Sequence, residues 1–100
     1  MRTEIIKNDI PVNKKLAEVI QHKADKVEER LKRYHPDVAD LEIRLEHNLN
    51  EYACALVLKA FRESMHAHKT APELRVAVDR SFDALFKELD HYRQKINKSL

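Results

Sequence analysis

The residues best suited to chemistry in this sequence are cationic side chains that recur along a long predicted helix, residues 72–100. At about 100° of rotation per residue, one helix face carries Arg80, Lys87, His91 and Lys98. A second face is acidic, with Asp79, Asp83 and Asp90, and a third is apolar, with Leu74, Val78, Phe82, Leu85, Leu89, Tyr92 and Ile96. Phosphates respond to the local field of a cationic patch, so this separation of charge is more informative than the net charge of +2.

An earlier predicted helix, residues 13–34, repeats this arrangement. Its cationic edge carries Lys15, His22, Lys23, Lys26, Arg30 and Arg33. Cations one or two helical turns apart, roughly 5–11 Å, are spaced like the phosphates of a nucleic-acid strand. Such contacts position a protein on RNA without reading its sequence. Two parallel helices of this kind predict a composite RNA-binding surface; the alternative is that the charges only cover a solvated face.

The composition narrows the class of protein. Hydrophobic residues make up 43% of the 100 residues, enough for the core of one domain, residues 1–100. Glycine is absent, so no glycine-rich phosphate loop exists, and no nucleophile motif surrounds a serine, histidine or cysteine. We therefore expect no enzyme, no cofactor and no small-molecule substrate. The sequence has no signal-peptide core, no apolar run long enough to span a membrane and a single cysteine, which together predict a cytoplasmic protein without membrane contact.

The predicted elements follow the order β-α-β-β-β-α. Strands are expected at 2–8, 41–46, 52–61 and 64–69, with turns at 48–50 and 62–63, and helices at 13–34 and 72–100. Asn13 is the expected N-cap of the first helix, and Thr70 with Glu73 fits a capping box for the second, with Pro72 in its first turn. The first two strands should be parallel and the others an antiparallel meander. The expected fold is α+β, with a four-stranded mixed sheet and two parallel helices on one face, as in double-stranded-RNA-binding domains.

The sheet holds two further candidates. His66 and His68 share a strand face, and Cys54 on the neighbouring strand is a conceivable third metal ligand, although two solvent-facing histidines are the simpler interpretation and no metal site is predicted. If Ala53, Ala55 and Val57 point toward the helices, an apolar patch faces outward, made of Tyr52, Cys54, Leu56 and Leu58. That patch would predict a protein–protein module or weak self-association. The opposite register would place these residues in the core, and both alternatives stay open.

Three segments resemble the ribosome hibernation promoting factor family, also called the sigma-54 modulation protein family, which includes the ribosome-associated translation inhibitors. Residues 76–89, VAVDRSFDALFKEL, are similar to the family's A-A-I-D-x-L-x-D-K-L-E-R-Q-L stretch. Residues 23–28, KADKVE, are similar to K-L-x-K-L-E, and residues 52–57, YACALV, are similar to x-A-x-A-x-I. The resemblance extends over almost the whole chain and looks like a divergent short form, without the long tail or the dimerisation domain of other members.

This resemblance implies a non-enzymatic factor that binds the small ribosomal subunit and its ribosomal RNA. It implies occupation of the channel for messenger and transfer RNA, inhibition of translation, and storage of idle ribosomes under stress or in stationary phase. By position, the implied RNA contacts are Lys23, Lys26, Lys87, His91 and Arg93. The chain departs from the family pattern where Ala84 replaces a lysine, Asp90 a basic residue, Arg75 an aromatic residue and Ala71 a glycine.

Overall fold

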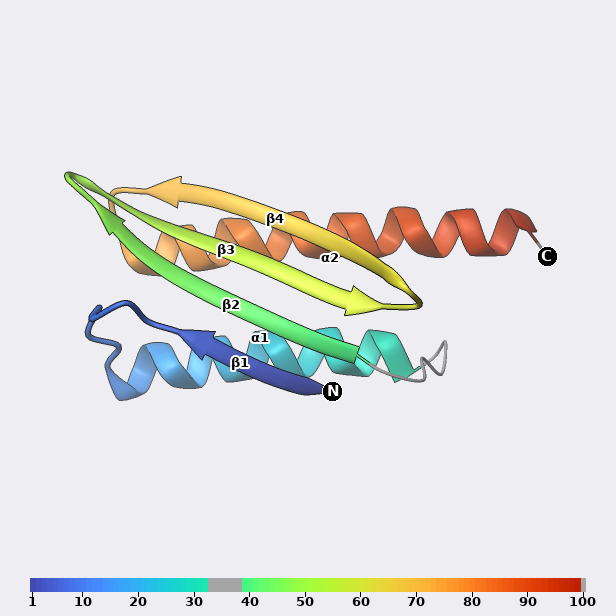
Figure 1. Ribbon diagram of the computed structural model, residues 1–100, viewed down its shortest axis with the longest axis horizontal. Coiled ribbons are helices and arrows are strands. Elements are labelled where there is room, and N and C mark those ends of the chain that lie inside the picture. Colours follow the sequence, from blue (N-terminus) through green and yellow to red (C-terminus); the bar gives the residue numbers. More distant parts are fainter. Residues whose placement is uncertain (33–38, 100) are drawn as a thin grey trace.

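The chain folds into a four-stranded sheet with two helices packed on one face (Figure 1). The computed structural model describes residues 1–32 and 39–99, with side chains up to residue 92. The elements are β1 (Arg2–Ile6), α1 (Lys14–Lys32), β2 (Ala39–Asn48), β3 (Glu51–Ala60), β4 (Glu63–Ala71) and α2 (Leu74–Ser99). Both helices run in the same direction along the sheet, which confirms the predicted fold class. Within this part of the chain, neither helix combines the length and hydrophobicity of a bilayer-spanning segment.

The strand order is β1-β2-β3-β4, so β1 and β4 are the edge strands. β1 pairs in parallel with β2, from Arg2 opposite Asp40 to Ile6 opposite Arg44. Parallel neighbours need a crossover connection, and α1 supplies it. β2, β3 and β4 form the predicted antiparallel meander.

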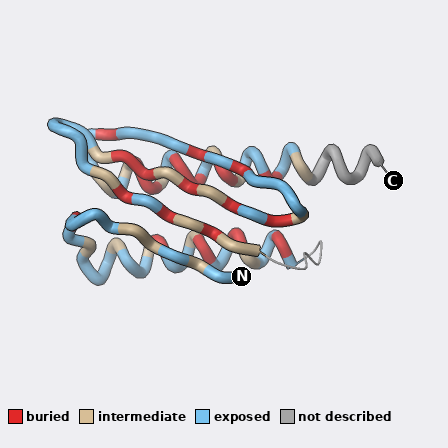
Figure 2. Tube along the Cα trace, in the orientation of Figure 1, coloured by how far each residue is buried: buried red, intermediate tan, exposed pale blue. Residues whose placement is uncertain are grey.

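The alternation of residues along the strands decides which sheet face packs against the helices. Leu41, Ile43 and Leu45 of β2 lie opposite Leu58, Leu56 and Cys54 of β3, and all six are at most 1% exposed. The helices cover them with a second apolar layer, formed by Ile20, Ala24, Val27, Leu31, Val78, Phe82, Leu85 and Leu89. Figure 2 shows the buried positions alternating along the central strands and recurring on the helices.

Of the two registers left open for β3, the structure has the one that places Cys54, Leu56 and Leu58 toward the helices. Cys54, Leu56 and Leu58 belong to the core, and Tyr52 lies on the same side, half-buried. The alternate residues, Ala53, Ala55 and Val57, lie on the open face of the sheet. The physical reason is that strand side chains have a period of two, and the larger apolar set buries more surface when it meets the helices.

The turns use left-handed backbone at residues other than glycine. Phe61 (φ 58°) and Arg62 (φ 63°) connect β3 to β4, one residue earlier than expected. Two successive positive φ angles match the tight hairpin turns whose twist suits paired strands. Phe61 also stacks on Tyr92 of α2, with ring centroids 5.1 Å apart, and this contact ties the hairpin to the helix.

The two helix starts differ from each other. The Asn13 side-chain oxygen accepts a hydrogen bond from the Leu16 N–H at 2.7 Å, which confirms the predicted N-cap of α1. The capping box at Thr70 is wrong, because β4 continues to Ala71 and Thr70 pairs there with Ala53. Pro72 precedes α2, and the Glu73 carbonyl accepts from the Ala77 N–H.

The register yields a matched pair of substitutions. Leu56→Ala removes a fully buried side chain and should lower the free energy of unfolding by about 2–5 kcal/mol. Val57→Ala, one residue along but on the open face, should cost about 1 kcal/mol or less. Urea denaturation followed by circular dichroism measures both. A larger loss for Val57→Ala than for Leu56→Ala would contradict the register.

Candidate nucleic-acid interface

The outer surface of α1 carries three of the cations that the sequence predicts. Ile20, Ala24, Val27 and Leu31 face the core, which leaves Lys15, His22 and Lys26 exposed along the helix. These three residues are the α1 stripe. They are seven and four residues apart, or about 10 and 6 Å along the helix axis. None of the three forms an ion pair with any other residue that the structure describes.

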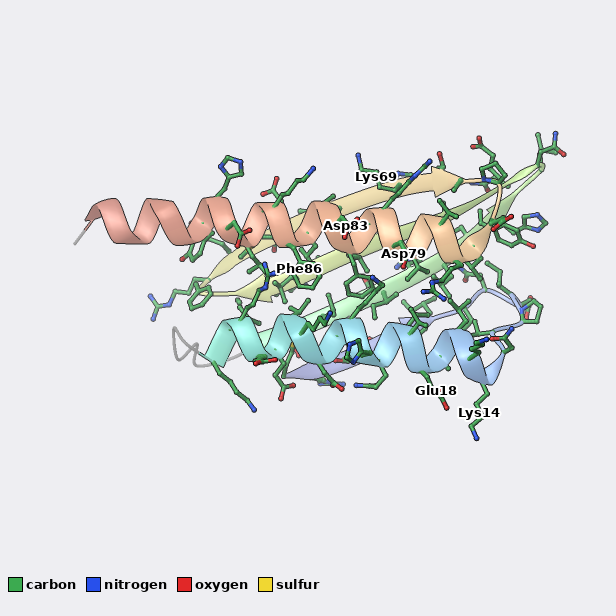
Figure 3. All side chains as sticks on the ribbon, turned by 180° about the vertical axis from the view of Figure 1, so that it is seen from behind. Lys14, Glu18, Lys69, Asp79, Asp83 and Phe86 are labelled. Carbon is green, nitrogen blue, oxygen red and sulfur yellow. The ribbon has the colours of Figure 1, made fainter. Side chains whose placement is uncertain are left out.

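Two other predicted cations of α1 turn toward α2 instead. Lys23 Nζ lies 3.2 Å from Asp79 Oδ1, and a guanidinium nitrogen of Arg30 lies 3.3 Å from Asp90 Oδ1. The Arg30 guanidinium also sits over the Phe86 ring, 4.3 Å from its centroid. We refer to these five residues as the interhelical seam. Figure 3 shows Asp79 and Phe86 on the side of α2 that faces α1.

The exposed cations of α2 lie on the other flank of that helix, next to β4. Arg80, Lys87 and His91 line a hollow of about 740 Å³ together with β4 residues that include Lys69. An Arg80 guanidinium nitrogen donates to the Thr70 carbonyl oxygen at 3.4 Å. We call this hollow the β4–α2 groove. The remaining predicted cations fall where no side chain is described: Arg33 lies outside the described residues, as do the side chains of Arg93 and Lys98.

The predicted cations thus form two groups rather than one composite surface. The α1 stripe lies on one side of the seam and the β4–α2 groove on the other. Between them, Asp79 and Asp90 neutralise Lys23 and Arg30. Asp79 and Asp90 lie next to α1, whereas Asp83, the third acidic residue of α2, lines the β4–α2 groove. The buried residues of each helix fix these positions by setting its rotation on the sheet.

The open face of the sheet does not assemble the metal site that was considered. His66 and His68 do share that face, opposite Val57 and Ala55. Cys54 lies on the helix side of β3 and is fully buried, so it cannot join them. Burial raises the pKa of the Cys54 thiol to about 11, against a smaller lowering by its hydrogen bond with Ser81. The thiol is therefore a core group.

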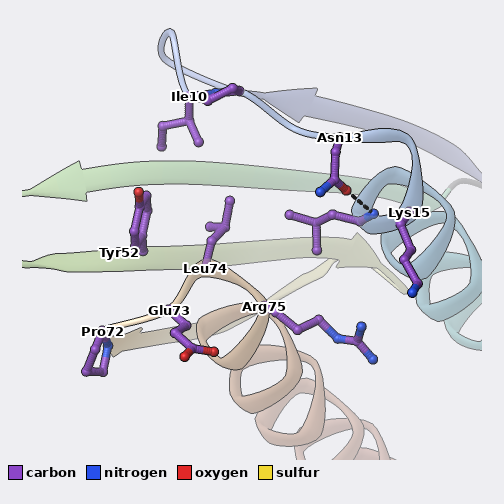
Figure 4. A pocket seen from close by; sticks show the side chains of 10 residues that line it. Ile10, Asn13, Lys15, Tyr52, Pro72, Glu73, Leu74 and Arg75 are labelled. Carbon is purple, nitrogen blue, oxygen red and sulfur yellow. Dashed lines mark hydrogen bonds between the residues drawn. The ribbon is translucent and has the colours of Figure 1, made fainter.

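A second hollow, of about 430 Å³, lies between the starts of the two helices (Figure 4). Asn13, Lys15 and Leu16 line it from α1 and its cap, and Leu74 and Arg75 line it from α2. Tyr52 contributes from β3, and its ring stacks on His47 with centroids 4.3 Å apart. Apolar side chains form much of this wall, whereas charged side chains predominate in the β4–α2 groove.

A comparison with protein families decides the class of the chain. Residues 3–97 match the profile described as "Sigma 54 modulation protein / S30EA ribosomal protein". The chain belongs to this ribosome-associated family. The comparison with curated proteins gives no match.

Two solved structures share the family fold. A ribosomal subunit interface protein from Coxiella burnetii is 18% identical, with a TM-score of 0.71 and coverage of 94% of this chain and 99% of that one. The N-terminal domain of Protein Y from Thermus thermophilus is 15% identical, with a TM-score of 0.74 and coverage of 92% and 99%. At these identities the likeness shows a common backbone arrangement and leaves the side-chain contacts to be argued from this chain.

Two of the four departures from the pattern that the sequence resembles, Asp90 and Arg75, lie at or beside the seam. Asp90 is the partner of Arg30, and Arg75 donates to both carboxylate oxygens of Asp79 at 3.4 and 3.3 Å. Ala84, a third departure, lines the β4–α2 groove. Lys69, which sequence analysis did not select, adds a cation to that groove. Its position on a strand next to α2 could have been found only from the β3–β4 register.

The seam predicts weak coupling between its partners. Arg30 and Asp90 have side chains 45% and 59% exposed, so water screens their attraction. A double-mutant cycle with Arg30→Ala and Asp90→Asn should give a coupling energy of about 0.2–1 kcal/mol that falls with added salt. Thermal or urea unfolding measures it. A coupling above about 2 kcal/mol would mean that the pair is a major support of the fold.

Proposed function

We propose that this protein binds the small ribosomal subunit through phosphates of its ribosomal RNA and inhibits translation by occupying the site of messenger and transfer RNA. Membership of the family supports a ribosomal partner. The observation that carries the proposal is the contrast between paired and unpaired cations. Seam cations already have carboxylate partners, whereas those of the α1 stripe and the β4–α2 groove have none among the described residues.

The mechanism that follows is competitive exclusion. Lys15, His22 and Lys26 on one side, with Arg80, Lys87 and His91 on the other, form charge-assisted hydrogen bonds to phosphate oxygens. The bound domain then denies the channel to other RNA by its volume, with no bond made or broken. Idle ribosomes are kept in this inactive state, as the family resemblance implies for stress and stationary phase. Arg33, Arg93 and Lys98 remain proposed contacts from the sequence alone.

Lys23 and Arg30 have a smaller role in this proposal. Each must leave a carboxylate before it can meet an external phosphate, and that carboxylate repels the phosphate. Both residues therefore contribute less to phosphate binding than the cations that have no carboxylate partner. The guanidinium of Arg30 is held further by the Phe86 ring.

A protein–protein function through the open sheet face has less support. Its basis was the outward apolar patch, and Leu56 and Leu58 are core residues. The open face instead carries charged residues, among them Arg2, Glu4, Glu42 and Lys59. Binding to duplex RNA free of ribosomes is a further alternative, since double-stranded-RNA-binding domains also combine a sheet with two helices. Co-sedimentation with small subunits in the presence of excess duplex RNA distinguishes the two functions. Pelleting that persists supports binding to the subunit, and pelleting that is lost supports binding to duplex RNA in general.

The proposal predicts the behaviour of a double variant. Lys26→Glu with Lys87→Glu should abolish most binding to purified small subunits at moderate salt. The logarithm of the association constant decreases with the logarithm of the salt concentration, and the steepness of this decrease should be smaller by about 2 in the variant, about one unit for each lost phosphate contact. Co-sedimentation at several salt concentrations measures both effects.

A matched control uses Lys14→Glu with Lys59→Glu, which changes the net charge equally. Lys14 points away from α2 (Figure 3), and Lys59 lies on the open face of the sheet. The control should pellet like the parent protein, and circular dichroism should show all three proteins folded. If the Lys26 and Lys87 variant pellets as tightly as the control, the two basic surfaces are not the interface.

A further inference from the structure

The β4–α2 groove combines side chains from two elements that are separate in the sequence. β4 contributes His68, Lys69 and Thr70, and α2 contributes Arg80, Lys87 and His91. Asp83, Ala84 and Glu88 complete the wall. Three side chains carry full positive charge, two carry negative charge, and two are imidazoles. The groove therefore carries a net positive charge.

The cations of this groove are free to meet an external anion. Among the described residues, neither Lys69 nor Lys87 forms an ion pair, and Arg80 contacts only the neutral Thr70 carbonyl. That single hydrogen bond holds the guanidinium beside the end of β4 and leaves other N–H donors available. In the seam, by contrast, a carboxylate lies within 3.3 Å of each cation.

Lys69 occupies an unusual position for a strand residue. It pairs with Cys54, so it lies on the helix side of β4, yet it is exposed. On an edge strand, a long side chain on the inner side can extend over the rim of the sheet. Figure 3 shows Lys69 beside α2. A lysine on an edge strand also prevents that strand from pairing with the edge strand of another molecule. The experiment must therefore separate a role of Lys69 in RNA binding from this role in preventing aggregation.

We propose that the β4–α2 groove is an RNA-backbone track in its own right, and that Lys69 is one of its phosphate contacts. This inference rests on the proposed function and adds an element, β4, to the interface. Arg80, Lys87 and His91 rise along α2 in steps of about 10 and 6 Å, so they extend over a distance that several phosphates of one strand occupy. Lys69 contacts that strand from the opposite wall. The carboxylates of the seam separate this strand from RNA bound at the α1 stripe.

The test is a titration of the ¹⁵N-labelled protein with a single-stranded RNA dodecamer at low salt. Amide signals of residues 68–70 and 80–91 should shift. Lys69→Glu should weaken the affinity for the RNA about tenfold, the effect of one charge-assisted contact. Lys69→Arg, which keeps the positive charge, should bind with an affinity close to that of the parent. Lys59→Glu, on the open face, is the charge-matched control and should bind like the parent. Melting temperatures show that each variant is folded.

Two results would overturn the inference: shifts confined to α1 or the open sheet face, or equal affinities for Lys69→Glu and Lys59→Glu. Pelleting with small subunits separates this inference from the proposed function. If the parent and Lys69→Glu pellet equally well, the groove is not a contact, although the ribosomal partner stands. If the dodecamer shifts the groove signals but the parent does not pellet, the groove stands and the ribosomal partner falls.

Discussion

The structure depends on the burial of one sheet face by two parallel helices. Leu41, Ile43 and Leu45 of β2 and the paired residues of β3 present a continuous apolar surface, and only helices with matching apolar faces can exclude water from it. This burial fixes the rotation of α1 and α2. Every exposed side chain of the helices then has a determined place. The position of each charge is a consequence of the core, although no charge belongs to it.

Because the core fixes the rotation of both helices, it also decides which charges meet in the interhelical seam. Exposed ion pairs such as Lys23–Asp79 and Arg30–Asp90 contribute little to folding. Their larger effect is on the electrostatic potential, because two cations lose their attraction for external phosphates and two carboxylates remain to repel them. In a chain of net charge +2, the cations that form no ion pair among the described residues then lie in the α1 stripe and in the β4–α2 groove, where Asp83 and Glu88 line the wall without pairing with them. Asp90, the partner of Arg30, belongs to that arrangement.

The sequence predicted the element order, the strand pairing and the helix faces, because those follow from periodicity and from residues such as Asn13 that act locally. It left the register of β3 open, since 52–58 is apolar on both alternating sets and only packing against the helices selects one. Thr70 was assigned to a helix cap because the extent of β4 depends on pairing with Ala53, a non-local contact. The site was predicted as a set of cations but not as two groups. The rotation of both helices decides which cations lie next to an acidic residue. Lys69 could be assigned to the candidate site only once the pairing of β4 with β3 was known.

The measurement that tests this account most directly is an electron cryo-microscopy map of the protein bound to the small ribosomal subunit. The account predicts that the helix side faces ribosomal RNA. Phosphates should lie beside Lys15, His22 and Lys26 and within the β4–α2 groove, while Lys23 and Arg30 keep Asp79 and Asp90 as partners. RNA contacting the open face of the sheet, or phosphates seated in the seam in place of those carboxylates, would contradict it. A map of subunits mixed with an excess of the protein that shows no density for it would also contradict the account.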